Sequence, residues 1–202
     1  MLDIYKIIEN TAVEGPGNRF CIWTQGCRKH CSGCWAKDTW NFGCGIKYEV
    51  EDLLSLIQKQ GTNIEGVTFL GGEPFEQAEE LSLLAECIKK QNLSVVCFTG
   101  YTIEELTSKN NRFINKLLSN IDILIDGGFE EEKFDLSRPW VGSSNQRYIF
   151  LTDIYDNTIL SSYKNKIEAR IMTDGRLEIN GMGDFKVIKE NLCLQLGKNR
   201  VE

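Results

Sequence analysis

Residues 26–35 read Gly26-Cys27-Arg28-Lys29-His30-Cys31-Ser32-Gly33-Cys34-Trp35. The three cysteines are spaced C-x3-C-x2-C, and three thiolates so close together form a soft, anionic ligand set that suits an iron–sulfur cluster or zinc. A cubane cluster has four irons, so three protein thiolates leave one iron open to a substrate or cosubstrate. Catalytic zinc sites keep an open position in the same way. We expect the rest of the chain to be organised around this loop.

Zinc is the alternative for the same cysteines, in a knuckle completed by His30, Cys21 or Cys44. Zinc sites are usually built from two tight pairs of ligands. This stretch offers one such pair, Cys31 and Cys34. The spacing therefore favours a cluster over zinc.

The composition indicates one compact domain. The 202 residues, 42% hydrophobic and 26% charged, suffice for one packed core and are slightly short for two. The net charge of -6 and the lack of a basic patch argue against nucleic acid as a partner. No apolar run approaches the roughly 20 residues that cross a bilayer, and the N-terminus lacks an export signal, so we expect a cytoplasmic protein without a membrane partner. Clustered cysteines in that reducing compartment suggest metal binding rather than disulfides.

Segments with the apolar pattern of a strand alternate along the chain with segments that have the apolar pattern of a helix. Strands are expected at 20–24, 65–70, 93–99, 121–125 and 147–151, with an edge strand at 2–9. Helices are expected at 48–60, at 76–90, and from a capping box at Thr102 and Glu105 to about Leu118. This alternation predicts an α/β fold with a parallel sheet, open or partly closed into a barrel.

The last fifty residues change character. Two alternating runs, 167–172 and 176–179, flank the turn Thr173-Asp174-Gly175, a pattern typical of an antiparallel hairpin. A last helix is expected near 184–195. Without a linker or repeat, we expect residues 151–202 to pack as an extension on the domain formed by 1–150.

Two further motifs place glycines beside charged side chains. Glu14-Gly15-Pro16-Gly17-Asn18-Arg19 is strong turn chemistry, with a backbone that could approach a partner closely. Gly71-Gly72-Glu73-Pro74 follows a strand, and its carboxylate could accept hydrogen bonds from an ammonium group. Each motif alone is also compatible with an ordinary turn.

Together these motifs resemble those of the radical S-adenosylmethionine superfamily. The resemblance is strongest to the activating enzymes of anaerobic ribonucleotide reductase, which belong to the activases of glycyl radical enzymes. It rests on six segments in the family's order, at 14–19, 26–40, 71–74, 98–101, 125–127 and 142–146. It implies that residues 1–150 form a radical S-adenosylmethionine core domain, an incomplete TIM-type β/α barrel with parallel strands, followed by the C-terminal hairpin extension.

The resemblance also implies cofactors and ligands. Cys27, Cys31 and Cys34 would hold a [4Fe–4S] cluster, whose fourth iron would chelate the amino and carboxylate groups of S-adenosylmethionine. His30 is expected to tune or cover the cluster. Gly72 and Glu73 would orient the methionine part, and Gly33 and Trp35 would border the adenine. The weaker candidates for the same ligand are Thr99 and Asp126.

The implied activity is that of an oxidoreductase that uses a 5′-deoxyadenosyl radical to take hydrogen from a glycine of a partner enzyme. That partner is expected to be anaerobic ribonucleoside-triphosphate reductase, and the electron donor a flavodoxin- or ferredoxin-type protein. Two departures from the family matter, because many activases have Asp where Glu14 stands and because residues 152–202 extend past the shortest members. A radical enzyme acting on a small molecule or peptide, and a non-catalytic metal-binding module, therefore stay open as alternatives.

Overall fold

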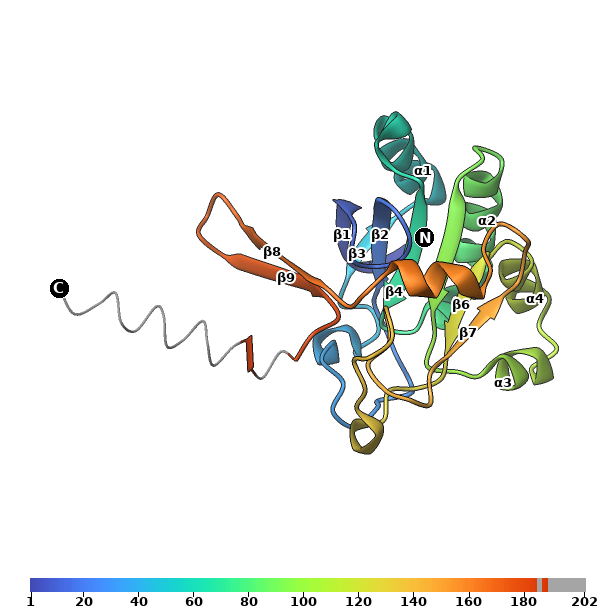
Figure 1. Cartoon of the computed structure of the whole chain (residues 1–202). Coiled ribbons are helices and arrows are strands. Elements are labelled where there is room, and N and C mark those ends of the chain that lie inside the picture. The colour runs from blue at the N-terminus through green and yellow to red at the C-terminus, as the bar shows by residue number, and fades with distance from the viewer. Residues whose placement is uncertain (185–186, 189–202) are drawn as a thin grey trace.

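A seven-stranded sheet forms the centre of the computed structural model, which describes residues 1–184 and 187–188 (Figure 1). Its strand order is β3-β1-β2-β4-β5-β6-β7. The strands are β1 (Leu2–Thr11), β2 (Arg19–Thr24), β3 (Ile46–Tyr48), β4 (Gly66–Gly71), β5 (Ser94–Phe98), β6 (Ile123–Asp126) and β7 (Arg147–Phe150).

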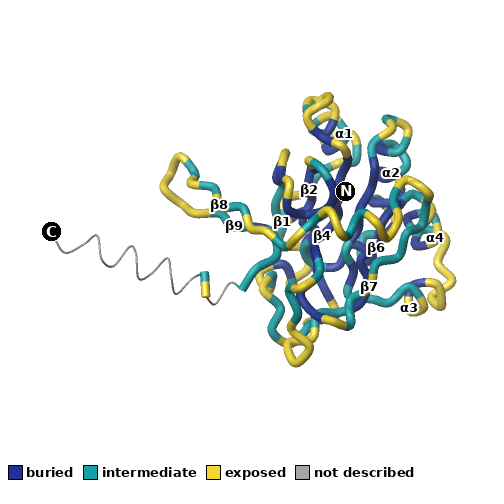
Figure 2. Tube along the Cα trace, viewed as in Figure 1, coloured by how far each residue is buried: buried dark blue, intermediate teal, exposed yellow. Residues whose placement is uncertain are grey.

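The middle of this sheet is parallel. Strands β2, β4, β5 and β6 run in one direction, and β1, β3 and β7 add antiparallel pairs at the two sides. Strands β2 and β6 are buried throughout (Figure 2), which explains why both read as continuous apolar runs in the sequence. The predicted α/β fold with parallel strands is confirmed at this level.

The edge strand was predicted wrongly. Strand β1 lies between β2 and β3, so β3 forms that edge. Strand β3 has three residues, Ile46–Tyr48, and its side chains are mostly exposed. A strand this short and exposed has no apolar periodicity, so the sequence pattern does not predict it.

Four α-helices cover one face of the sheet: α1 (Val50–Lys59), α2 (Ala78–Lys89), α3 (Ile103–Ser108) and α4 (Arg112–Leu118). Helix α2 buries the predicted stripe of Leu81, Leu84, Ala85 and Ile88. Short 3-10 turns complete the elements: η1 (Lys37–Thr39), η2 (Gly61–Asn63), η3 (Pro74–Gln77), η4 (Glu131–Lys133) and η5 (Asn157–Ser162).

The single helix expected from Thr102 to Leu118 is two helices. Its start is confirmed, because Thr102 and Glu105 form the predicted capping box of α3. Asn110 then adopts a φ of 46°, and the Asn111 side chain accepts a hydrogen bond from Phe113 N at 2.8 Å to begin α4. Asparagine tolerates this conformation and also caps helices. The two asparagines therefore separate α3 from α4, although the apolar spacing continues through them.

The C-terminal hairpin is confirmed. Strands β8 (Ile167–Ile171) and β9 (Leu177–Gly181) pair with each other alone and project from the side of the domain (Figure 1). The helix expected near 184–195 lies largely outside the described residues. None of the helices in the described part is long and apolar enough to cross a membrane.

Candidate radical site

The cysteine loop leaves the sheet at the carboxyl end of β2 and is closed by backbone hydrogen bonds. Gly26 N donates to Thr39 O at 2.7 Å, and Cys27 N donates to Trp40 O at 3.0 Å. The His30 ring stacks on Trp40 with 4.5 Å between ring centroids. Hydrogen bonds between its two ends therefore hold the loop closed.

Six of the nine predicted site residues line one cavity of about 140 Å³ beside this loop. They are Cys27, Cys31, Cys34, Gly72, Glu73 and Thr99. Cys27 is buried, the other two cysteines are half-buried, and all three are free thiols. Burial raises the pKa of the Cys27 and Cys31 thiols.

The donor set fits a cluster better than a single ion. In the described residues, no three histidine, cysteine or acidic side chains converge closely enough for one metal ion. In this part of the chain, none of the alternatives His30, Cys21 and Cys44 therefore forms a zinc knuckle with the cysteines of the loop. A cubane separates its thiolates further than one ion does, and three thiols spread around one cavity suit that larger group.

Glu73 joins the ends of two parallel strands. Its carboxylate is fully buried and accepts hydrogen bonds from Thr99 Oγ1 at 2.8 Å, Gly100 N at 2.7 Å and Phe75 N at 3.0 Å. Burial raises the pKa of Glu73 to about 7, because desolvation outweighs these hydrogen bonds. The group thus stands near the point where it exchanges a proton at neutral pH.

Gly72 holds the same region against the cysteine loop. Its N–H donates to Thr24 O at 2.8 Å, and Glu73 N donates to Gly26 O at 2.9 Å. A methyl group on Gly72 would lie 2.5 Å from Gly26 O. Glycine is therefore required here for close approach of two backbone segments.

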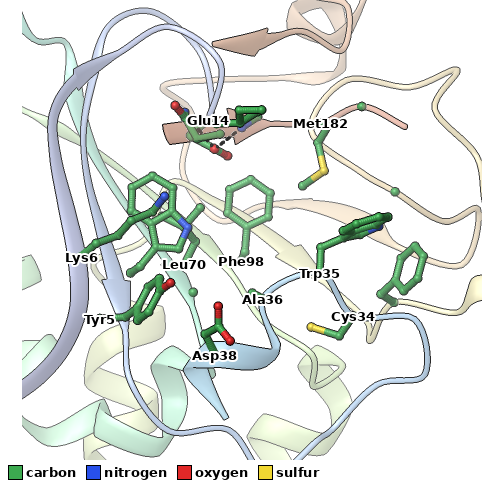
Figure 3. Close-up of a pocket in the computed structure, with 18 of the residues that line it drawn as sticks. Tyr5, Lys6, Glu14, Cys34, Trp35, Ala36, Asp38, Leu70, Phe98 and Met182 are labelled. Carbon is green, nitrogen blue, oxygen red and sulfur yellow. Dashed lines mark hydrogen bonds between the residues drawn. The ribbon is translucent and has the colours of Figure 1, made fainter. Parts of the chain in front are cut away.

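A larger cavity of about 440 Å³ adjoins the first one (Figure 3). The two share Cys34, Gly71, Phe98, Phe129 and Gln146. Figure 3 shows Lys6 and Tyr5 on one side of the larger cavity and Cys34 and Trp35 on the opposite side. Tyr5, Lys6 and Asp38 line this cavity without a local motif that would predict them as site residues.

Residues of the hairpin also line the larger cavity: Ile179, Asn180, Gly181, Met182 and Gly183. In the sequence they follow the cysteine loop by more than a hundred residues, and the fold brings the two segments together. The extension is therefore part of the wall next to the cysteines.

The charged ends of the Gly-Pro-Gly turn both face inward. Arg19 is fully buried, and its five N–H groups donate to neutral oxygens of Pro16, Val67, Thr68 and Ser94.

Glu14, also buried, lines the larger cavity but turns its Oε1 to the hairpin. That atom accepts hydrogen bonds from Gly181 N at 2.7 Å and Asn180 Nδ2 at 3.2 Å. Burial raises the pKa of Glu14.

The remaining predicted site residues, Gly33, Trp35 and Asp126, do not line the smaller cavity. Trp35 lines the larger cavity, whereas Gly33 and Asp126 line neither of the two cavities. The buried Asp126 carboxylate accepts hydrogen bonds from Ile103 N at 2.8 Å and from Arg147 at 2.6 and 2.9 Å. Its oxygens thus fix the start of α3, and its contact with a cofactor stays a prediction.

Comparison with known proteins agrees with this geometry. A family model described as a 4Fe-4S single cluster domain matches residues 13–149. The anaerobic ribonucleoside-triphosphate reductase-activating protein of Pasteurella multocida is 34% identical over 142 residues, which cover 66% of this chain and 88% of that protein. The chain belongs to the family of these activating proteins. It is a radical S-adenosylmethionine enzyme with a [4Fe–4S] cluster and S-adenosylmethionine as its cofactors.

Other family members show the same extent of similarity. The protein of the same name from Enterobacteria phage T4 is 32% identical over 148 residues, covering 70% of this chain and 89% of its own. Among solved structures, QueE from Escherichia coli has a TM-score of 0.42 and 27% identity, covering 50% of this chain and 53% of that chain. The family model ends at residue 149, so the hairpin lies beyond it.

Proposed function

We propose that this protein installs a glycyl radical on an anaerobic ribonucleoside-triphosphate reductase. The single observation that carries the proposal is the gathering of three free thiols, Gly72, Glu73 and Thr99 around one cavity of a chain in this family. Relatives at 34% identity are named as activating proteins of that reductase.

In this proposal Cys27, Cys31 and Cys34 hold the cluster. When bound, the cluster would supply the single electron for reductive cleavage of S-adenosylmethionine, and thereby the 5′-deoxyadenosyl radical for hydrogen abstraction from the target glycine. Gly72 and Glu73 orient the methionine part, and Thr99 fixes the Glu73 carboxylate. Gly33 borders the adenine, and Thr99 and Asp126 are the weaker candidates for direct contact with the same ligand.

The larger cavity then receives the target segment. Its lining is mostly aromatic and aliphatic, with Trp23, Trp35, Phe98 and Phe129 among its side chains. Such a lining keeps water from a reactive radical, while Trp35 borders the adenine.

The finer points of architecture follow the same proposal. Residues 1–150 form the core domain, an incomplete TIM-type barrel, and the described part of the extension that begins at residue 151 packs on it. The parallel order β2-β4-β5-β6, with the cysteine loop at the carboxyl end of β2, supports the barrel. A hydrogen bond from Gly17 N to the Tyr163 hydroxyl at 3.0 Å supports the packing.

A flavodoxin- or ferredoxin-type donor supplies electrons in the cytoplasm, where thiols stay reduced.

The test uses reconstituted, reduced protein mixed without oxygen with S-adenosylmethionine and the anaerobic reductase of the same organism. We expect the doublet of a glycyl radical by electron paramagnetic resonance. Cys34→Ala should abolish both the doublet and the visible absorbance of the cluster, and Cys87→Ala, a half-buried helical thiol, should keep both. Cleavage of S-adenosylmethionine without a doublet would instead favour a small molecule or peptide as substrate.

A further inference from the structure

The β8–β9 hairpin has its apolar face turned outward. Residues opposite each other in the pairing are Ile167 and Gly181, Ala169 and Ile179, and Ile171 and Leu177. Because side chains alternate along a strand, these pairs share one face, called here the outer face. Ile171 is 83% exposed, Leu177 42% and Ile167 38%. None of the residues of this face belongs to a hydrophobic core cluster of the described chain.

The opposite face of the hairpin is polar, and the domain holds it by hydrogen bonds. Glu168 accepts from Thr11 Oγ1 at 2.8 Å and from Ala12 N at 3.0 Å. Arg170 donates to Asn10 O at 3.0 Å, and Asn180 donates to Thr11 Oγ1 at 3.1 Å. These contacts, together with buried Glu14, fix the hairpin with its polar face inward, so the exposure of the outer face is built into the structure.

The outer face is continuous with the larger cavity. Ile179 belongs to both, since it pairs with Ala169 on the outer face and lines the cavity beside Cys34 and Trp35. The next pair on this face, Ile171 and Leu177, lies about 7 Å further toward the turn and outside the lining of the cavity. A protein that places one segment in the cavity would cover the strand as well.

We propose that the outer face is a docking surface for the protein substrate, namely the part of the reductase next to its target glycine. The inference rests on the proposed function and adds a contact that the family model, ending at residue 149, does not include. Aliphatic side chains at the rim of a cavity bury apolar area when a protein partner closes over it. The hairpin thus selects the partner, while the cysteine loop performs the chemistry.

The test is the double variant Ile171→Glu and Leu177→Lys in the full-length chain. These positions lie directly opposite each other, so the new charges pair across the strands and keep the hairpin formed. We expect the KM for the reductase to rise at least tenfold, with the effect falling on KM rather than on kcat. The control is Ile154→Glu, which charges an equally apolar and 56% exposed residue outside the hairpin and should leave KM unchanged.

Three outcomes would overturn the proposal. An unchanged KM in the double variant, with the wild-type chain still giving the glycyl radical doublet, would remove the docking surface and leave the proposed function standing. A concentration-dependent dimer that the double variant abolishes, again with unchanged KM, would assign the outer face to a second copy of this chain. A wild-type chain that neither binds nor activates the reductase would overturn the proposed function and this inference together.

Discussion

Arg19 is a buried charge whose partners are all neutral. Its five N–H groups are used by backbone and hydroxyl oxygens of the Gly-Pro-Gly turn, β4 and β5, and burial lowers the pKa of the guanidinium. A residue with fewer donors leaves several of those oxygens unsatisfied, which costs free energy because they are out of reach of water.

We therefore expect Arg19→Lys to lower the free energy of unfolding by about 3 kcal/mol, since an ammonium group cannot reproduce a planar five-donor fork. Urea unfolding followed by circular dichroism measures the change. Arg176→Lys, an exposed position in the hairpin turn, is the control and should change stability by less than about 0.5 kcal/mol. Equal effects of the two substitutions would show that the buried network is not important for stability.

Glu73 makes stability depend on pH near neutrality. Its pKa in the folded chain is about 7, above the usual 4.5 of an unfolded glutamate. The folded state therefore binds the extra proton, so the stabilisation is complete below pH 4.5 and is lost as the pH rises through 7. Relative to Glu73→Gln, the free energy of unfolding of the cluster-free wild type should fall by about 2 kcal/mol between pH 5 and 8. Parallel pH profiles of the two proteins would contradict this assignment.

At the scale of single elements, the attachment of the hairpin depends on the length of one side chain. Glu14 reaches Asn180 and Gly181 from the turn before β2. Glu14→Asp withdraws the carboxylate by one methylene and should break both hydrogen bonds. We expect backbone amides of residues 176–183 to exchange hydrogen about tenfold faster, as loss of about 1.4 kcal/mol implies.

Hydrogen exchange followed by mass spectrometry measures this change. Glu9→Asp, which shortens an acid of β1 bonded to Gln60, serves as the matched control and should leave 176–183 protected. If exchange in the hairpin is the same in both variants, then Glu14 does not hold it.

Elements with long or strongly patterned sequences could be predicted, and short ones could not. The central strands and α2 follow from runs of apolar residues, and the hairpin from alternation around Asp174-Gly175. The position of β1 depends on β3, whose three residues carry no pattern. The break between α3 and α4 depends on Asn110 and Asn111, and the apolar spacing continues across both of them. In each failure, tertiary pairing or a polar cap outweighed the periodicity.

The whole molecule places groups side by side that the sequence keeps far apart. The family resemblance assigned the three cysteines, Gly72, Glu73 and Thr99 to one site, and all six line one cavity because they follow neighbouring parallel strands. Lys6 and the 179–183 segment have no motif, and they reach the larger cavity through strand pairing and hairpin docking. Asp126, predicted beside the cofactor, accepts hydrogen bonds from Arg147 and Ile103, and its contact with the cofactor stays a prediction.

Binding of the cosubstrate should stabilise the entire domain. A ligand that binds only the folded state at 100 times its Kd raises the free energy of unfolding by about 2.7 kcal/mol. We expect S-adenosylmethionine to do so for the cluster-loaded protein in oxygen-free thermal unfolding. The cluster-free protein should show little change, since the open iron supplies the main attachment. Equal stabilisation of both forms would place the ligand away from the cysteines.

Neither β8 nor β9 contributes a residue to the hydrophobic core clusters of the described chain. The hairpin is attached through polar contacts to the end of β1 and to the turn that follows it. A hairpin attached in this way can be exchanged for another without repacking of the hydrophobic core. Target choice in this enzyme is thereby separable from its chemistry, and transfer of residues 164–183 to a shorter relative offers a route to redirect a radical activase to a new client.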